Sequence, residues 1–158
     1  MTRERDPIRP TDDEARALAR DLVENARFAS LAVLVEGRPF VTRVAIGTGP
    51  EGQPLTLVSD LALHTRALRA DPRASLLVGE PGPRGDPLAH PRLTLEVEAV
   101  LEDMTSGLRD HYLATHPKSK LYVDFGDFHF VSFAVSAFHL NGGFGQAFRL
   151  TPADLGLA

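Results

Sequence analysis

Apolar residues recur along this chain at two different spacings, and the change of spacing separates predicted helices from predicted strands. From Ala15 to Ala26 they follow the spacing of a one-sided helix, and Thr11 with Glu14 forms a capping-box pattern in front of it. Residues 1–10 are polar and contain two prolines. We therefore expect a flexible N-terminal arm over residues 1–10, followed by a surface helix.

After this helix the apolar residues alternate with polar ones, as they do in strands with one buried face. Glycine, proline and acidic turn residues divide the alternating stretch into short pieces. The six strands predicted in this way are Ser30–Val35, Pro39–Gly47, Pro54–Ser59, Arg73–Val78, Arg92–Leu101 and Phe128–Leu140. Further helical patterns lie at Leu63–Ala70, Met104–Thr115 and Ser119–Phe125.

Consecutive strands joined mostly by tight turns favour an antiparallel sheet over a parallel one, which needs a crossover between strand pairs. The last strand carries apolar residues on both faces, which fits a barrel wall that also packs on a helix or a partner subunit. The pattern therefore predicts a mainly β fold with flanking helices, in which antiparallel strands close into a barrel. Gly79–Pro91, rich in glycine and proline, is expected to be a long loop, either functional or a plain connection.

The composition bounds the function without defining it. A chain of 158 residues suits a single domain, which we place at residues 11–158. The net charge of -4 gives no reason to expect nucleic-acid binding. No signal peptide or membrane span is recognisable, so we expect the protein in the cytoplasm. The chain has no cysteine, which excludes disulfides and thiolate metal sites, and no motif predicts a metal site.

One stretch, Leu55–Leu68, combines a strand, a turn and a helix start. Ser59 ends the strand with a hydroxyl, and Thr65 and Arg66 lie at the opening of the helical pattern. Free backbone N–H groups and the positive dipole end of a helix attract anions, so hydroxyl and guanidinium groups there indicate a phosphate site. Taken alone, the same residues also fit ordinary helix capping.

Two arginines lie at comparable places on other strands. Arg43 lies on the second predicted strand, and Arg92 opens the fifth. If the sheet curls, neighbouring strands bring these two side chains to the same rim as the hydroxyls and guanidinium of the Leu55–Leu68 stretch. The planar fork of arginine suits two-point binding of phosphate oxygens. The sequence therefore predicts a phosphate-containing ligand at the barrel rim.

Five sequence blocks in order resemble a known family, the FMN-binding split barrels related to pyridoxamine 5'-phosphate oxidase, and within it the heme-utilisation (HugZ-like) branch. The blocks are PFVTRVAIG, LTLVSDLALHTRALRADPRASLLV, GDPLAHPRLTLEVEAV, HPKSKLYVDFGDF and NGGFGQAF. The resemblance spans roughly Ala26–Phe148. It implies a six-stranded antiparallel split β-barrel and a homodimer that holds FMN at the subunit interface.

Carried over by position, the resemblance implies cofactor contacts on three segments. Arg43 and the backbone after it run beside the flavin. Val58 and Ser59 end a strand near the ribityl phosphate, and the phosphate-binding pair follows at the helix start. Arg92 falls near a position where a polar side chain meets the ring. The implied cofactor-binding residues are Arg43, Val44, Ala45, Ile46, Val58, Ser59, Thr65, Arg66 and Arg92.

Three functions follow from the residues and the resemblance together. The first is an FMN-dependent oxidoreductase of an unassigned small-molecule substrate, in which the flavin supplies the redox chemistry. The second is heme binding or heme degradation on the same barrel, with an axial ligand drawn from the six histidines. The third is a flavin-free dimeric binding module. No catalytic residue is assigned, and His64 receives no role.

This sequence differs from members of the resembled family in two ways, and each difference argues against one possible activity. Pyridoxamine phosphate oxidases have a lysine near the end of the second strand, where this chain has Thr48, and a C-terminal tryptophan and Arg-x-His segment that this chain lacks. This departure argues against pyridoxamine phosphate oxidase activity. Members of the heme branch often continue into a C-terminal extension, whereas we expect a short form that ends at Ala158. A distal heme-ligating histidine on such an extension then has no counterpart.

Overall fold

The centre of the fold is one long strand, β8 (Phe128–Asn141), which pairs with neighbours along both edges. The structure is a computed structural model and describes residues 6–157. The other elements in chain order are β1 (Ile8–Arg9), α1 (Asp13–Asn25), β2 (Phe28–Val35), β3 (Arg38–Ala45), β4 (Gly47–Thr48), β5 (Pro54–Ser59), α2 (Leu63–Ala70), β6 (Arg73–Val78), η1 (Pro87–Ala89), β7 (Arg92–Glu102), α3 (Ser106–Thr115), η2 (Pro117–Leu121), β9 (Ala147–Leu150) and η3 (Pro152–Leu155).

Within residues 6–157 the strands form one nine-stranded sheet in the order β1-β9-β8-β7-β6-β2-β3, with β5 paired to β8 and β4 paired to β5. All six predicted strands are present. The predicted strand number was too low because β1, β4 and β9 have two to four residues, too few to show alternation. The sheet is barrel-like, which is consistent with the predicted split barrel, but it does not close as the strand pattern led us to expect. No ladder joins β3 to β5, and the two strands meet through a bond from the Thr56 hydroxyl to the Ala45 carbonyl.

A β-bulge in β8 explains why apolar residues occur on both of its faces. Val97 pairs with Val135 whereas Glu96 pairs with Ala137, so Ser136 has no partner in the register. Before the bulge, odd-numbered residues such as Phe133 face the principal core, and after it even-numbered residues do so. A buried row crosses the sheet through Leu31, Leu76, Leu95, Phe138 and Leu150.

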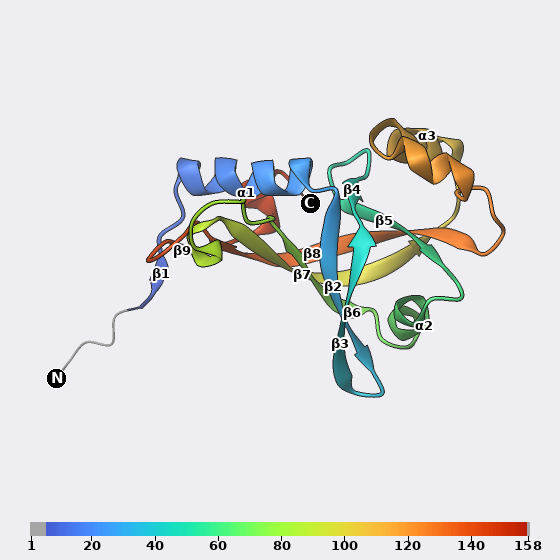
Figure 1. Ribbon diagram of the computed structural model, residues 1–158, viewed down its shortest axis with the longest axis horizontal. Coiled ribbons are helices and arrows are strands. Elements are labelled where there is room, and N and C mark those ends of the chain that lie inside the picture. Colours follow the sequence, from blue (N-terminus) through green and yellow to red (C-terminus); the bar gives the residue numbers. More distant parts are fainter. Residues whose placement is uncertain (1–5, 158) are drawn as a thin grey trace.

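A second, smaller core lies on the other face of the first half of β8. Phe130 of β8 packs edge-on against Tyr112 of α3, with their ring centres 5.3 Å apart. The predicted contact between the last strand and a helix is therefore confirmed. In Figure 1, α3 and η2 lie beside β4 and β5, at the end of the molecule away from β9. The segment predicted as a helix from Ser119 is instead the 3-10 helix η2, which ends at Leu121.

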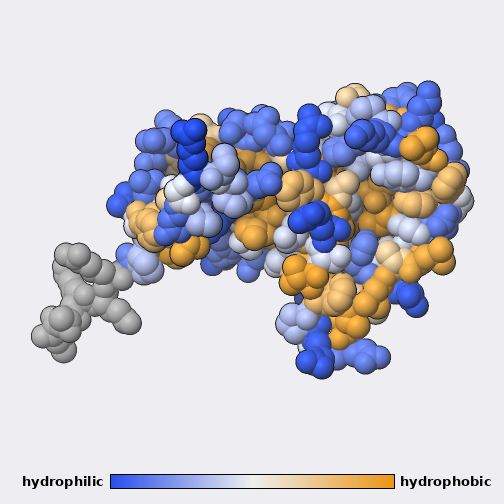
Figure 2. Space-filling view, viewed as in Figure 1, coloured by the Kyte–Doolittle hydropathy of each residue, from blue (hydrophilic) through white to orange (hydrophobic). Residues whose placement is uncertain are grey.

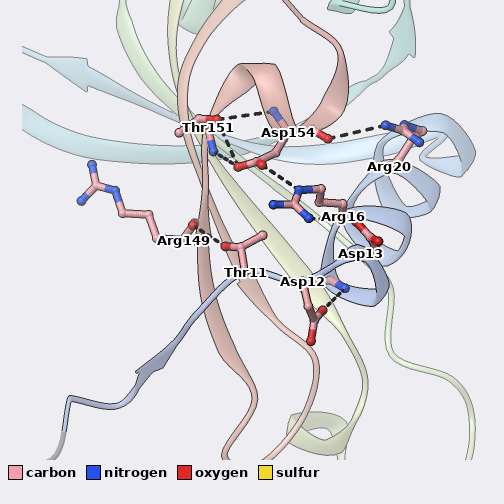
Figure 3. A network of polar contacts seen from close by, with 9 residues as sticks. Thr11, Asp12, Asp13, Arg16, Arg20, Arg149, Thr151 and Asp154 are labelled. Atoms are coloured by element: carbon pink, nitrogen blue, oxygen red, sulfur yellow. Dashed lines mark hydrogen bonds and ion pairs between the residues drawn. The ribbon is translucent and has the colours of Figure 1, made fainter.

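The first helix packs its small side chains, Ala15, Ala19 and Val23, into the principal core. Its predicted capping box is wrong. The Asp12 carboxylate accepts the N-terminal hydrogen bond from the Ala15 amide, because the Thr11 hydroxyl donates instead to the Arg149 carbonyl on β9. Figure 3 shows both contacts.

The first helix is held to the C-terminal segment that contains η3. The guanidinium of Arg16 donates to Asp154, which also closes a capping box with Thr151 at the start of η3 (Figure 3). Of the expected arm, Ile8–Arg9 is extended and pairs in parallel with β9, while residues 1–5 lie outside the described residues. No helix in the described part of the chain is both long enough and apolar enough to cross a membrane.

The buried row makes a direct stability prediction at Phe138. Its side chain is 0% exposed, so Phe138→Ala leaves a cavity in the principal core and should lower the free energy of unfolding by about 3–5 kcal/mol. Phe144→Ala is the matched control, since Phe144 is 69% exposed and should lose less than about 1 kcal/mol. Urea denaturation of both variants measures the difference, and equal losses would contradict the assignment of the core.

Candidate functional site

A groove of about 510 Å³ opens where the end of α1 meets the start of β2 and the end of β6. Two arginines, Arg27 and Arg43, line it together with the apolar side chains of Phe28 and Leu77. The Arg43 guanidinium carbon lies 5.2 Å from the ring centre of Phe28, in a cation–π arrangement. Asp21 and Glu80 line the groove as well, so it combines apolar walls with two arginines and two carboxylates.

A row of side chains leads from this groove across the outer face of the sheet. Ser30 pairs with Arg43 on one side and Leu77 on the other, Leu77 pairs with Thr94, and Thr94 pairs with His139. Directly opposed residues in neighbouring strands point to the same face. The row therefore lies on the face opposite to the buried row. It begins at Arg43 and continues past His139 to Arg149 of β9, which pairs with His139.

The outer face also carries exposed apolar side chains, Val41 on the β2–β3 hairpin and Leu77 on the neighbouring strand β6. Val41 is 63% exposed. Phe40 is exposed as well, but it pairs with the buried Val33 and therefore lies on the opposite face of the hairpin. In Figure 1 this hairpin projects away from the rest of the molecule, and Figure 2 shows hydrophobic atoms along it with hydrophilic atoms at its tip. Exposed apolar side chains gathered in this way are typical of a surface that contacts a ligand or a partner.

The predicted phosphate cradle lies at the end of β5, where its two hydroxyls already bond to the protein. The Ser59 hydroxyl donates to the Asp127 carboxylate at 2.8 Å and accepts from the Leu61 amide at 3.1 Å. The buried Thr65 hydroxyl donates to the Ser59 carbonyl at 2.6 Å. The structure thus brings Ser59 and Thr65 together, in the contacts expected of capping.

The start of α2 keeps features of an anion site. Its N-cap residue, Ala62, supplies no side-chain cap, so the first N–H groups of the helix receive no side-chain acceptor. Arg66 is exposed. Asp60 lies in the same turn and accepts from His129 and from Arg69, so both signs of charge lie near this helix end.

The remaining predicted cofactor residues divide between the core and the long loop. Val44, Ile46 and Val58 are buried in the principal core, so only their backbone is available to a ligand. The Arg92 guanidinium donates to the carbonyls of Leu88 and His90, which ties it to the Gly79–Pro91 loop. Among residues 6–157, no hydrogen bond or ion pair joins either predicted strand arginine to the cluster at Ser59.

His64 on α2 is half-buried, and this burial lowers the pKa of its imidazole. Its ring is therefore held toward the neutral form at physiological pH. The structure adds no hydrogen bond that would assign it a role.

Sequence reasoning identified one groove residue, Arg43, and missed its neighbours. Arg27, Phe28 and Ser30 come from the junction of α1 with β2, and Leu77 comes from a strand 34 positions after Arg43. The one feature of the sequence that could have indicated these residues is an arginine followed by an aromatic residue at the start of a strand, Arg27 and Phe28. The groove exists because three elements end side by side, which no local pattern records.

Comparison with known proteins identifies the family. The sequence profile described as "CREG, beta-barrel" matches residues 10–155, which is nearly the whole chain. The protein therefore belongs to the CREG β-barrel family. The predicted resemblance is supported at this level, because the CREG-type barrel has neighbours among heme-binding proteins and pyridoxamine phosphate oxidase-like folds.

Among individual relatives, the chain is similar to the non-canonical heme oxygenase HOZ, chloroplastic, of Arabidopsis thaliana. The two are 37% identical over 115 residues, 72% of this chain and 35% of that one. A heme binding protein from Mycobacterium smegmatis is 32% identical, with a TM-score of 0.82 over 94% of this chain and 61% of its own. The chain thus spans about a third of the length of the Arabidopsis protein and about three fifths of the length of the Mycobacterium protein.

A more distant solved structure shows the fold alone. The putative pyridoxamine 5'-phosphate oxidase from Listeria innocua is 15% identical, with a TM-score of 0.66 over 81% of this chain and 98% of its own. This neighbour supports the general barrel architecture that the sequence predicted. The Arabidopsis and Mycobacterium relatives, both above 30% identity, are described as a heme oxygenase and a heme binding protein, so these two comparisons support the heme alternative better than the flavin prediction.

Proposed function

We propose that this protein binds heme in the groove at the end of α1. The observation that carries the proposal is the pair Arg27 and Arg43 in a groove of about 510 Å³ with apolar walls. The relatives described as a heme oxygenase and a heme binding protein support the same ligand.

The chemistry of the lining fits the chemistry of heme. Heme presents a flat apolar macrocycle and two propionate carboxylates. Phe28 and Leu77 offer apolar contact to the macrocycle, while the Arg43 guanidinium suits paired bonds to a carboxylate. The Arg27 guanidinium donates to the Thr115 carbonyl at 3.5 Å and would have to leave this long contact to bind a second carboxylate. Asp21 and Glu80 also line the groove, so the arginines must outweigh their repulsion of the propionates.

We assign the iron ligand to His139, which lies further along the outer-face row, beside Arg149 of β9. Four strand spacings separate His139 from Arg43, about 19 Å along the sheet, which a heme and an extended arginine side chain together can span. The His139 Nε2 lies 3.4 Å from the Glu96 carboxylate, a weak contact on an exposed face. The rings of His90, His116 and His129 are held by hydrogen bonds within the fold.

A flavin is the second candidate, favoured by the uncapped start of α2 and the exposed guanidinium of Arg66. These groups suit the FMN phosphate, and a bound flavin would supply hydride chemistry. The site would have to release the hydroxyls of Ser59 and Thr65 from their present bonds, in the presence of the Asp127 carboxylate. This cost makes FMN the weaker candidate.

We further propose that the protein works as a homodimer. The exposed apolar side chains of Val41 and Leu77 lie on or beside the outer-face row, so a second copy on this face would cover them and the open side of the groove. Dimerisation would thus enclose the ligand more completely than one chain does.

The heme proposal makes a prediction at Arg43. Arg43→Ala removes one charged partner of a propionate, worth about 1.5–3 kcal/mol, and should weaken heme binding about tenfold or more. Titration of the purified protein with hemin, followed at the Soret band, measures the affinity. Arg38→Ala is the control, because Arg38 lies at the exposed hairpin turn and should leave the affinity unchanged.

Absence of a Soret shift in the unmodified protein would overturn the proposal. Addition of ascorbate and oxygen to the complex separates two kinds of heme protein. A stable Soret band indicates a binding protein, and a progressive loss of the band indicates heme degradation.

A separate prediction concerns the iron ligand. His139→Ala should change the position of the Soret band and the spin state of the bound heme, while His111→Ala, on the exposed face of α3, should change neither. Absorption and electron paramagnetic resonance spectra of the two complexes measure this. An unchanged spectrum for His139→Ala would exclude this histidine as the ligand.

The flavin candidate is tested at Arg66. If FMN binds at the start of α2, Arg66→Ala should weaken its binding at least about tenfold, since a charged hydrogen bond to phosphate is lost. Quenching of flavin fluorescence on titration gives the affinity, with Arg38→Ala again as control. Failure of the unmodified protein to quench FMN would eliminate the candidate.

A further inference from the structure

The Gly79–Pro91 loop leaves the sheet and returns to it at one point. Gly79 has φ +103°, and a Cβ at this position would lie 2.7 Å from the Pro91 carbonyl oxygen and 2.8 Å from the Arg92 Cα. Only glycine allows the two ends of the loop to approach so closely. The loop is thus fixed at its base, and its position depends on what holds the rest of it.

One side chain, His90, holds the body of the loop together. The Gly82 amide donates to His90 Nδ1 at 3.2 Å, and His90 Nε2 lies 2.7 Å from the Arg84 carbonyl oxygen. A Cβ on Gly82 would lie 3.0 Å from the ring carbon Cε1, so the chain passes directly against the imidazole. His90 therefore joins the two arms of the loop through both ring nitrogens.

These two hydrogen bonds require the neutral ring in one tautomer. Nδ1 must accept from the Gly82 amide, while Nε2 must carry the proton that is donated to the Arg84 carbonyl. A second proton would turn Nδ1 into a donor facing another donor. The bond to Gly82 is then lost and replaced by repulsion, so the closed loop excludes the protonated ring.

The loop forms one wall of the ligand groove. Its first residues, Gly79, Glu80 and Pro81, line the groove together with Arg43 and Phe28. Release of the segment around Gly82 therefore frees this wall.

We propose that the Gly79–Pro91 loop is a lid on the groove, latched by neutral His90 and released when the ring is protonated. The latch itself rests only on the geometry of the loop. Its effect on a ligand rests on the proposed heme-binding function.

Among the described residues, no charged side chain near His90 forms a hydrogen bond or an ion pair with its ring. Within the loop the charged side chains are Glu80, Arg84 and Asp86, and the Asp86 carboxylate accepts from the Leu88 amide. Arg92 of β7 donates to backbone carbonyls of the loop. The β8–β9 turn, which meets the loop through Gly143, contains no charged residue between positions 142 and 146. The switch therefore depends on the His90 ring itself.

The direction of the pH effect follows from proton linkage. The closed loop binds no proton on Nδ1, whereas the open loop can bind one, so falling pH favours the open loop. Once the ring titrates, each further pH unit multiplies the ratio of open to closed loop by up to about tenfold. Histidine is the side chain whose charge normally changes between pH 5 and 8, which sets the pH range of the tests below.

The latch is tested first without ligand, by hydrogen exchange of the Gly82 amide at pH 7.5, 6.5 and 5.5. Expressed as a protection factor, exchange protection should fall by up to about tenfold for each pH unit in the unmodified protein. The His90→Asn variant keeps an acceptor oxygen at the place of Nδ1 but does not titrate, so its protection should be independent of pH. Constant protection in the unmodified protein, or an equal fall in both proteins, would overturn the latch.

The lid is tested by the rate at which heme leaves the protein for apomyoglobin. Heme release from the unmodified protein should accelerate between pH 7.5 and 5.5 by several-fold more than release from His90→Asn. His111→Asn, which removes an exposed histidine outside the loop, should behave as the unmodified protein does. Equal acceleration in His90→Asn and the unmodified protein would overturn the lid. If no heme binds, the proposed function fails, and the Gly82 measurement still decides the latch.

Discussion

The fold depends on how β8 is shared between two halves of one sheet. Its edge away from β7 pairs first with β5 and then with β9, and the bulge at Ser136 lies between the two ladders. The Ser136 hydroxyl donates to the Glu96 carbonyl, so the bulge does not leave that backbone oxygen unsatisfied. Because the bulge shifts the register by one residue, both halves of the strand can bury their large side chains in the same core.

This shared strand also sets the outer face on which the candidate chemistry lies. Every residue that follows or precedes a member of the buried row points outward, which aligns Arg43, Leu77 and His139 across the sheet. A face built in this way is broad and partly apolar, with charge at its ends. Such a surface suits a flat ligand with peripheral carboxylates. The compact cluster at Ser59 suits a phosphate less well, because its hydroxyls already form hydrogen bonds within the protein.

In the proposed function, the groove and the loop beside it place ligand contact and ligand release in one region. Arg27 and Arg43 would supply fixed charge, since a guanidinium stays protonated throughout the physiological range. His90, in contrast, holds a loop rather than a ligand. Because the proposed switch, His90, is a different residue from the arginines that would bind the ligand, the loop can move away from the groove while Arg27 and Arg43 stay in place.

The sequence alone determined the local elements and the general architecture. Alternation and turn residues gave β5, α2 and β6 with their observed bounds, because each has a strong local period and a clear stop. The site was only partly predictable. Tertiary structure alone decided the bulge at Ser136, the short strands and the groove, since each depends on which residues of distant segments meet. The tertiary structure also shows that the Thr65 hydroxyl donates to the Ser59 carbonyl. A local sequence pattern cannot tell such a backbone contact from a contact to a ligand.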